Sequence, residues 1–294
     1  YDIRVEFFES SGNARFRVVW DAGIDNNWEK KIEEAVEVAR NCDVAVIVAG
    51  IEEGEFRDRA MLGLPGHQET LISAVAKTGK PVVVVIVGGS AVTMSDWIDD
   101  AAGILLAWYP GEVGGHALTS LLFGDANPSG KLPITFPVSE AQLPLYYNHK
   151  PTGRGDNYIN LTGEPLFPFG YGLSYTEFEY SDLRIEKEHI RPDGSTKVAC
   201  TVKNVGDRPG AEVVQLYLRE VLSSVARPVT ELKGFQRVIL EPGEEKVVGF
   251  DLNEEHLGML NAEMERVVEP GDFRIMIGRS CKDIRLRGFV EVLD

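Results

Sequence analysis

One short loop of the sequence carries most of the residues that could move a proton. Between positions 52 and 59 it holds four carboxylates and two guanidiniums. These are Glu52, Glu53, Glu55 and Asp58, with Arg57 and Arg59. An acid placed among other acids can have a raised pKa, which suits a general acid near neutral pH. Composition alone favours a plainer interpretation, a solvated acidic loop in which Asp58 and Arg59 form structural ion pairs.

Two further loops, residues 88–90 and 109–115, are rich in glycine. All three loops follow apolar runs, and open parallel sheets bind their ligands at the carboxyl ends of the strands. The glycines could admit a phosphate or a dinucleotide, but the residues match neither G-x-G-x-x-G nor a P-loop. We therefore interpret them as tight turns and close packing, and we expect no cofactor.

Other reactive residue types are scattered along the chain. No H-E-x-x-H or C-x-x-C motif occurs, and the five histidines are dispersed. Three cysteines are too few and too far apart for a zinc knuckle or a disulfide scaffold. The chain also lacks a G-x-S-x-G elbow for a serine nucleophile. We expect no metal site.

The apolar runs that precede the loops must position them. These runs lie at residues 44–48, 81–87 and 103–108. They do not alternate with polar residues, which indicates strands buried on both faces of a parallel sheet. Helical periodicity within residues 32–39 and 71–76 places helices between and beside them. Residues 22–140 are therefore predicted to form an αβα sandwich domain around a parallel sheet.

The rest of the chain is predicted to be a connection followed by a β-sandwich. Residues 141–176 lack a clear period, and their many aromatic residues indicate an ordered linker that packs on another part of the chain. In residues 177–294 the apolar period is two, as at Val198, Cys200 and Val202, and turn signals separate the runs. This pattern predicts an all-β, immunoglobulin-like sandwich.

The first 21 residues have a pattern of their own. Residues 1–8 and 14–20 alternate apolar and polar side chains around a turn, which predicts a β-hairpin. Two strands are not stable alone in water, so we expect the other strands of this sheet to lie outside the chain. The chain opens in mid-pattern at Tyr1, as we expect of the interior of a longer polypeptide.

The balance of charge limits the partners. Thirty Lys and Arg stand against 46 Asp and Glu, for a formal net charge of −16. Nucleic acid and an anionic membrane surface are therefore not expected as partners. The longest apolar run, residues 81–87, has the length of a strand and not of a membrane-spanning helix.

Ordered motifs along the chain resemble those of a known family. They are E-F-R-D-R at 55–59, L-P-G-H-Q-E at 64–69, A-W-Y-P-G-E at 107–112 with G-G at 114–115, F-G-D-A-N-P-S-G-K-L-P at 123–133, and P-F-G-Y-G-L-S-Y at 168–175. They resemble glycoside hydrolase family 3, the family of β-glucosidases and β-xylosidases. The last motif is this family's usual entry into a fibronectin type III-like domain, which is expected here at residues 177–294. The hairpin of residues 1–21 resembles the end of a PA14 domain, which some members insert into the α/β domain.

The resemblance implies a retaining mechanism with two carboxylates, typically about 5 to 5.5 Å apart. In this family the general acid/base is often a glutamate four residues before the Arg of an Asp-Arg pair. Counted back from Arg59, that glutamate is Glu55, and Glu53 and Glu52 are the alternatives. The residues expected to support the loop or to touch the sugar are Glu53, Phe56, Arg57, Asp58 and Arg59.

The nucleophile of the family is an Asp in an N-terminal (β/α)8 barrel, and this chain has no such barrel. Met94-Ser95-Asp96-Trp97 imitates the family's nucleophile motif, but it follows the run at residues 81–87, where Ser95 is expected to cap a helix. Asp96 is therefore not the expected nucleophile. We expect the chain to be the C-terminal portion of a larger enzyme, inactive alone, with the barrel chain as its partner.

Three functions remain open. The first is the acid/base half of an exo-acting β-glycosidase, with terminal β-D-glucosyl residues as the default substrate and β-xylosides or α-L-arabinofuranosides as alternatives. The second is a non-catalytic fragment that binds carbohydrate or protein. The third is a structural fragment whose sandwich serves as a spacer or as the contact of a homo-oligomer. The PA14-like and fibronectin-like parts favour a secreted or periplasmic protein, although some relatives are cytoplasmic.

Overall fold

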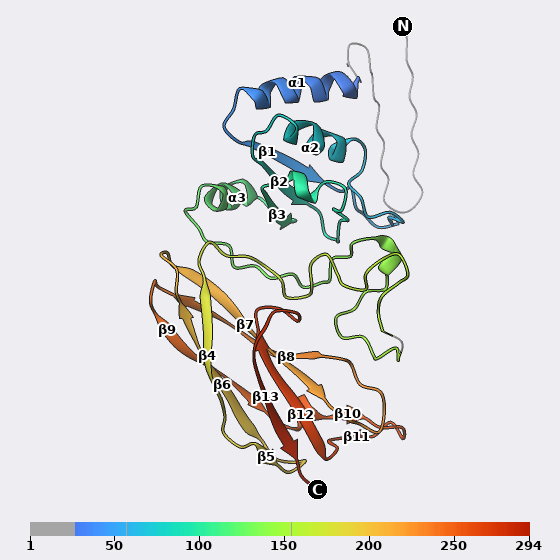
Figure 1. Cartoon of the computed structure of the whole chain (residues 1–294), viewed down its shortest axis with the longest axis vertical. Helices are drawn as coiled ribbons and strands as arrows, with labels where there is room; N and C mark the ends of the chain where they lie inside the picture. The colour runs from blue at the N-terminus through green and yellow to red at the C-terminus, as the bar shows by residue number, and fades with distance from the viewer. Residues whose placement is uncertain (1–26, 57, 154) are drawn as a thin grey trace, which may run out of the picture.

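The computed structural model describes residues 27–56, 58–153 and 155–294. The hairpin predicted for residues 1–21 lies outside them. An α/β domain comes first along the chain, a β-sandwich follows, and a long irregular segment runs between the two (Figure 1). This is the order of fold classes that the sequence predicts.

The α/β domain is built on a parallel sheet. Its described strands are β1 (Ala45–Gly50), β2 (Val82–Val87) and β3 (Gly103–Trp108), in the order β1-β2-β3. Its described helices are α1 (Trp28–Arg40), α2 (Gln68–Ala76), the 3-10 helix η1 (Ile98–Asp100) and α3 (Gly114–Leu122). The three apolar runs are thus confirmed as parallel strands, whose carboxyl ends lie at one edge of the sheet.

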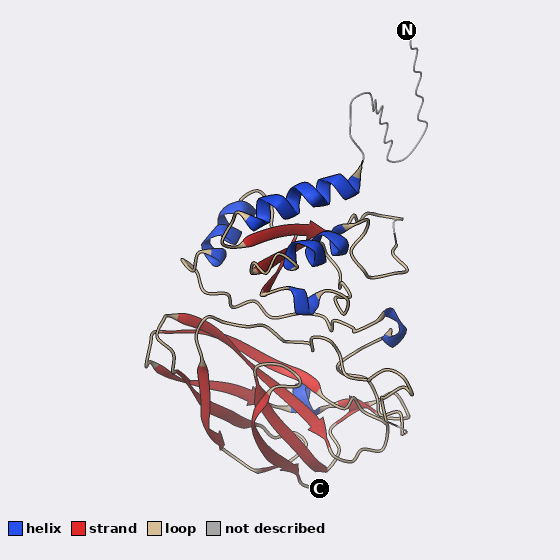
Figure 2. Cartoon of the chain, turned by 45° about the horizontal axis from the view of Figure 1, so that its top comes forward, coloured by secondary structure: helices blue, strands red, loops and turns tan. Residues whose placement is uncertain are grey.

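One face of this sheet packs against α1 and α2 (Figure 2). Ile47 of β1 and Val84 of β2 share a core cluster with Ala39 of α1 and Ile72 of α2. Val84 and Ile72 are fully buried. The apolar face that the sequence assigned to each helix is the face that meets the sheet.

The segment between β2 and β3 differs from the prediction. Instead of a helix capped by Ser95, it contains the single turn η1, whose N-cap residue is Trp97. The Ser95 hydroxyl donates to the carbonyl oxygen of Val138 at 3.0 Å. The reason is burial: Met94 and Trp97 are 2% and 1% exposed, and Ala101 already has the extended backbone that leads into β3.

The linker is ordered, as its aromatic residues predict. It doubles back on the preceding chain, because Leu132 N–H donates to Tyr171 O and Gly170 N–H donates to Leu132 O, both at 2.8 Å. Tyr147 stacks on Phe169 with ring centroids 4.1 Å apart. The linker also contains the 3-10 helix η2 (Glu140–Gln142).

The C-terminal body is a sandwich of two sheets, which confirms the predicted all-β class. The larger sheet has the order β5-β13-β12-β7-β8, formed by β5 (His189–Ile190), β13 (Ile284–Val292), β12 (Gly271–Gly278), β7 (Gly210–Glu220) and β8 (Glu231–Leu240). The smaller sheet is β4 (Phe178–Ile185), β6 (Thr196–Asn204) and β9 (Glu245–Leu252), in the order β4-β6-β9. The short elements α4 (Glu254–Leu257), β10 (Met259–Leu260) and β11 (Arg266–Val267) precede β12. Val198, Cys200 and Val202 point into the core between the sheets, as their alternation predicts.

A buried cluster of charges joins the preceding chain to the sandwich. Glu212 on β7 is fully buried and forms ion pairs with Lys131 at 3.2 Å and with Arg279 at 3.5 Å. Burial lowers the pKa of Lys131, and the carboxylate of Glu212 opposes that shift. Nearby on β7, the Gln215 amide donates to Gly170 O at 3.1 Å. One buried carboxylate therefore holds cations from two different parts of the chain.

Candidate active site

The loops that follow β1, β2 and β3 meet at the carboxyl edge of the sheet, around the carboxylate of Glu53. Glu53 Oε2 accepts a hydrogen bond from Gly89 N–H at 2.7 Å and another from the Tyr109 hydroxyl. Glu53 Oε1 accepts one from the Ser90 hydroxyl. Each of the three loops thus contributes to one cluster, which is what a parallel arrangement of the strands requires.

Arg59 fastens the far end of the first loop to the same place. Its guanidinium donates to Ser90 Oγ at 2.8 Å and to the carbonyl oxygen of Ala91 at 3.2 Å. A longer bond of 3.4 Å reaches Gly63 O. Glu53 and Arg59 therefore hold the loop at two points, and Ser90 lies between them.

The surroundings of Glu53 favour its ionised form. Partial burial would raise the pKa of this carboxyl. The hydrogen bonds from Ser90, from Tyr109 and from the Gly89 N–H outweigh burial, and the pKa of Glu53 is lowered. The hydrogen bond that the Tyr109 hydroxyl donates to Glu53 raises the pKa of the Tyr109 phenol. A carboxylate of this kind is an acceptor that fixes the loop and a poor proton donor.

We expect this cluster to come apart in acid. Because the pKa of Glu53 in the folded chain lies below its ordinary value of 4.5, its hydrogen bonds stabilise the loop fully above that pH and are lost as the pH falls through the lowered pKa. The amide resonance of Gly89, followed by NMR from pH 7 downwards, should therefore titrate with a midpoint below 4.5. In Glu53→Gln this titration should be absent, and a midpoint above 4.5 in the unaltered chain would contradict the assignment.

Glycines in the second loop permit the close approach of its neighbours. A Cβ added to Gly89 would lie 2.6 Å from Tyr109 Cε2 and 3.0 Å from Glu53 Oε2. A Cβ added to Gly88 would lie 2.3 Å from Ile51 Cγ1. The sequence predicts tight turns and close helix packing at these glycines, whereas the neighbours that they admit here lie on the adjacent loops.

Gly89→Ala is expected to lower the free energy of unfolding by about 1 kcal/mol, the net worth of a hydrogen bond, because Tyr109 is 63% exposed and its ring can turn into solvent. The Tyr109 ring has to move, and the hydrogen bond to Glu53 is lost with it. Gly130→Ala is the control, because Gly130 lies outside the helices and strands and a Cβ there has nothing within 4 Å. Urea unfolding of both variants measures the difference, and equal midpoints would show that the space around Gly89 is not restrictive.

Glu55 lies at the turn of the first loop, exposed to solvent. Its side chain makes no hydrogen bond or ion pair with any other described residue. The adjacent Phe56 is 92% exposed and has φ 62°, a left-handed backbone conformation that residues other than glycine rarely adopt. Asp58 is also exposed, and Arg57 lies outside the described residues. The loop therefore presents Glu55 and Phe56 outwards while its two ends are held.

The structure brings the three loops together, as their places after the apolar runs predict, but the sequence did not indicate all of the side chains that touch. Tyr109, Ser90 and the Gly89 N–H were not singled out as partners of Glu53. The usable signal was their position, since each directly follows the end of an apolar run. Asp96, which imitates the nucleophile motif, is exposed on the segment before η1.

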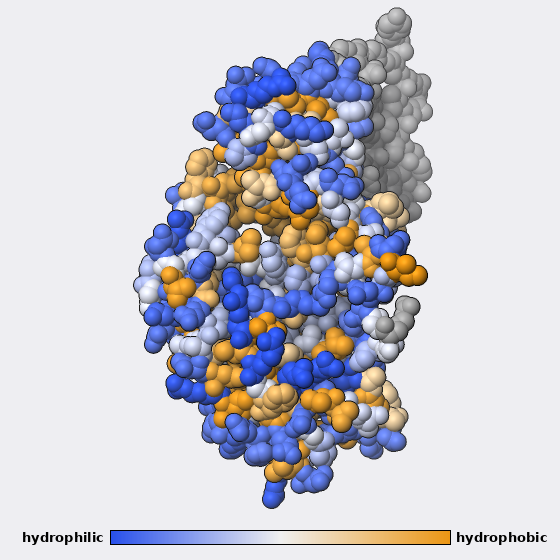
Figure 3. Space-filling model, in the orientation of Figure 1, coloured by the Kyte–Doolittle hydropathy of each residue, from blue (hydrophilic) through white to orange (hydrophobic). Residues whose placement is uncertain are grey.

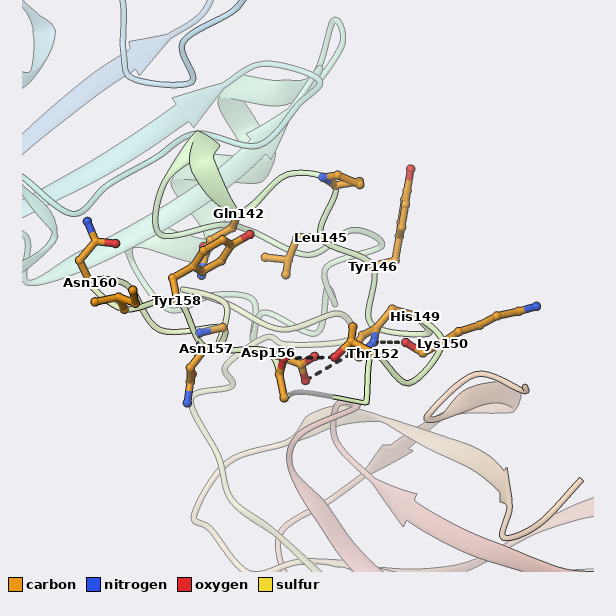
Figure 4. A pocket seen from close by; sticks show the side chains of 14 residues that line it. Gln142, Leu145, Tyr146, His149, Lys150, Thr152, Asp156, Asn157, Tyr158 and Asn160 are labelled. Atoms are coloured by element: carbon orange, nitrogen blue, oxygen red, sulfur yellow. Dashed lines mark hydrogen bonds and ion pairs between the residues drawn. The ribbon is translucent and has the colours of Figure 1, made fainter. Parts of the chain in front are cut away.

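A cavity of about 520 Å³ lies in a different part of the chain, within the linker (Figure 4). Its lining includes Gln142, Tyr146, His149, Asp156 and Tyr158, and His149 Nε2 lies 3.8 Å from Asp156 Oδ2. The three loops at the sheet edge contribute nothing to this lining. The cavity and the Glu53 cluster thus lie at different places, and the loop that the cluster holds is the one in which the sequence predicts an acid/base residue.

The described residues contain neither a metal-binding cluster nor a membrane-spanning helix. No three His, Cys, Asp or Glu side chains among them gather closely enough to bind a metal ion. None of their helices has the length and apolar character to cross a membrane.

Comparison with known proteins identifies the family. Residues 7–175 match the glycosyl hydrolase family 3 C-terminal domain, and residues 212–281 match a fibronectin type III-like domain. The first match alone covers more than half of the chain. The chain therefore belongs to glycoside hydrolase family 3.

The chain is similar to individual enzymes of known name, each over only part of their length. The chain is 42% identical to "Thermostable beta-glucosidase B" of Acetivibrio thermocellus, over 98% of this chain and 40% of that protein. It is 41% identical to "Beta-xylosidase" of Formosa agariphila, over 88% of this chain and 37% of that protein. The crystal structure of a β-glucosidase from Listeria innocua in complex with glucose superposes with a TM-score of 0.86 at 36% identity, covering 90% of this chain and 39% of that one. The chain thus spans well under half the length of these relatives.

Proposed function

We propose that this chain is the C-terminal portion of a retaining, exo-acting β-glucosidase and that Glu55 is its general acid/base. The observation that carries the proposal is the first loop, which is held at both ends to the ligand-binding edge of the sheet and presents Glu55 outwards at its turn. An N-terminal barrel would supply the nucleophilic Asp across from it.

The reaction then takes two steps. The barrel carboxylate attacks the anomeric carbon while the Glu55 carboxyl gives its proton to the glycosidic oxygen, so the C–O bond breaks and the aglycone leaves as an alcohol. In the second step the Glu55 carboxylate takes a proton from water, whose oxygen attacks the anomeric carbon and displaces the barrel carboxylate. Glu53 and Arg59 position the loop throughout. Phe56, Arg57 and Asp58 are the residues close enough in sequence to touch the sugar.

Terminal β-D-glucosyl groups are the substrates we propose first, because most of the similar proteins are named as β-glucosidases. β-Xylosides are the second candidate, since two similar proteins of Formosa agariphila are named a beta-xylosidase and a putative beta-xylosidase. For the domains we propose residues 22–140, 141–176 and 177–294. Residues 1–21 as the end of a PA14-like insertion stay a prediction.

The test is reconstitution. The chain is combined with the part of the Acetivibrio thermocellus enzyme that lies outside the match, and hydrolysis of 4-nitrophenyl β-D-glucoside is measured. We expect each part to be inactive alone, and the combination to be active and heavier than the 32.5 kDa of the chain. The two parts could instead form a complex that binds glucose in calorimetry but hydrolyses no substrate. That result would favour the alternative, a non-catalytic carbohydrate-binding fragment.

A further inference from the structure

A carboxylate of the linker reaches the chain just beyond the first loop. Glu140 Oε1 accepts a hydrogen bond from the main-chain N–H of Leu62, which lies 78 residues earlier in the sequence. Leu62 follows closely after Arg59, the second point at which the loop is held. Figure 1 shows η2, drawn in green, near the loop that follows β1. The linker therefore contacts the segment that ends the proposed acid/base loop.

The segment around Leu62 is held from three sides. The carbonyl oxygen of Leu62 accepts from Thr93 N–H at 3.1 Å, so the chain after β2 holds one side and Glu140 holds the other. Two residues further on, Leu64 N–H donates to Glu69 Oε1 at 2.8 Å. Hydrogen bonds to carboxylates are stronger than those between neutral groups. Two carboxylates, one on the linker and one on α2, thus fix two nearby amides of this segment.

The turn that carries Glu140 is itself firmly held. Gln142 is 3% exposed, and its side-chain amide makes three hydrogen bonds. It accepts from Val138 N–H at 2.7 Å and donates to the carbonyl oxygens of Thr162 and Glu164 at 2.8 and 3.0 Å. These bonds tie η2 to the chain before it and to the returning arm of the linker. The Glu140 carboxylate therefore extends from a fixed base.

This part of the linker is also anchored on the α/β domain. Phe136 is 1% exposed, and its ring meets the rings of Trp108 and Phe167 edge-on. The hydroxyl of Ser95 adds its hydrogen bond to Val138 O. Figure 3 shows polar and apolar side chains together filling the space between the two bodies on the side of the molecule where the linker runs. Glu140 thus connects the loop to a packed interior.

The place of Glu55 depends on how the two ends of its loop are held. Glu55 is exposed at the turn, and Glu53 fixes the chain before it. After the turn, Arg59 and the main chain of Leu62 are the points of attachment. A general acid must stay within hydrogen-bond reach of the leaving oxygen, and a displacement of about 1 Å can cost a large factor in rate. An attachment of the loop end is therefore important for the position of the acid.

We propose that Glu140 is a positioning residue for the acid/base loop. Its hydrogen bond to Leu62 N–H fixes the end of the loop and, through the main chain, the place of Glu55. The inference rests on the proposed function and adds to it a residue of the linker, outside the three loops at the sheet edge. Glu140 acts on the reaction only through the loop that it holds.

Amide exchange in the full chain of residues 1–294 tests the contact without any turnover. In Glu140→Leu the Leu62 amide should exchange at least about tenfold faster, because its N–H donates to no other described residue. The Leu64 amide, which Glu69 holds, should keep its rate. In Glu140→Gln, whose carboxamide oxygen can accept the same bond, most of the protection of Leu62 should remain. Exchange of Leu62 that Glu140→Leu leaves unchanged would overturn the proposal.

Kinetics of the reconstituted enzyme test the role of the contact. Glu140→Leu should lower kcat/KM for cellobiose by about 10- to 100-fold, the order of effect of a small displacement of a reacting group. The loss for 2,4-dinitrophenyl β-D-glucoside should be smaller, because its leaving group needs no proton, whereas a general folding defect would lower both equally. Glu140→Gln should restore most of the rate. Glu164→Leu is the matched control, because that linker carboxylate pairs with Lys282 at 2.8 Å, and it should behave like the unaltered chain.

Two kinetic results would refute the positioning role alone. The first is an active complex in which Glu140→Leu speeds exchange at Leu62 but leaves both rates unchanged. The second is an equal loss on both substrates that Glu140→Gln does not repair. If the unaltered complex hydrolysed neither substrate, the proposed β-glucosidase function would itself be wrong, and the positioning role would fail with it. The activity of the unaltered complex therefore distinguishes the two failures.

Discussion

Glu55→Gln, in the enzyme reconstituted with its N-terminal part, is expected to lower kcat/KM for cellobiose by about 10²–10⁴-fold, the usual contribution of a general acid. The glutamine cannot protonate the departing sugar alkoxide. For 2,4-dinitrophenyl β-D-glucoside kcat/KM should fall far less, because the dinitrophenolate departs as a stable anion and needs no proton. Initial rates with both substrates at several concentrations give the comparison.

The neighbouring carboxylates are the matched controls. Glu52→Gln should change kcat/KM for both substrates little. Glu53→Gln should lower kcat/KM for both, with a weaker leaving-group dependence than Glu55→Gln, because it loosens the loop that holds the proton donor without removing the donor. Equal losses on the two substrates in Glu55→Gln would sink the assignment. If Glu52→Gln or Glu53→Gln showed the leaving-group dependence instead, that residue would be the acid/base.

The second large effect concerns stability. Glu212→Ala should lower the free energy of unfolding by about 3–5 kcal/mol, because Lys131 and Arg279 would lose the buried carboxylate that pairs with both of them. Urea unfolding followed by the fluorescence of the sandwich aromatics measures this loss. The segment before the linker should also become more accessible to proteases, since Lys131 attaches that segment to β7.

Asp251→Ala is the control for that experiment. Asp251 pairs with Lys197 at 3.9 Å, but both side chains are more than 70% exposed. Water and salt screen such a pair, so its loss should cost at most about 1 kcal/mol. If Glu212→Ala were no more destabilising than Asp251→Ala, the buried cluster would not be holding the segment around Lys131 on the sandwich.

The sheet and the sandwich were predictable because their apolar patterns are strong and local. Residues 81–87 are apolar without a break, and that pattern has few explanations besides a strand covered on both faces. The turn around Ser95 was not predictable from its capping preference. Burial of Trp97 and Met94 decides the backbone there, and tertiary packing overrides a local propensity worth about 1 kcal/mol.

The partners of Glu53 show a different limit. Gly89 is 36 residues from Glu53 in the sequence, and Tyr109 is 56 residues away. The parallel sheet brings their loops to one edge, because the carboxyl ends of parallel strands lie at the same edge. The strand pattern does not predict which side chains of these loops will form hydrogen bonds. The role of Glu55 rests on its position before Arg59 and on the family resemblance, so it stays a prediction until the variants are measured.

The anchoring of Glu53 also bears on how a proton can be handled repeatedly without disturbing the geometry. In the proposed cycle Glu55 gives up a proton and regains one in every turnover, so its charge alternates. Glu53, two residues away, stays in a single protonation state because three donors from other loops surround it. The loop thus combines Glu55, whose charge changes in every turnover, with Glu53, whose charge stays the same. The hydrogen bonds of Glu53 therefore need not rearrange when Glu55 loses or regains its proton.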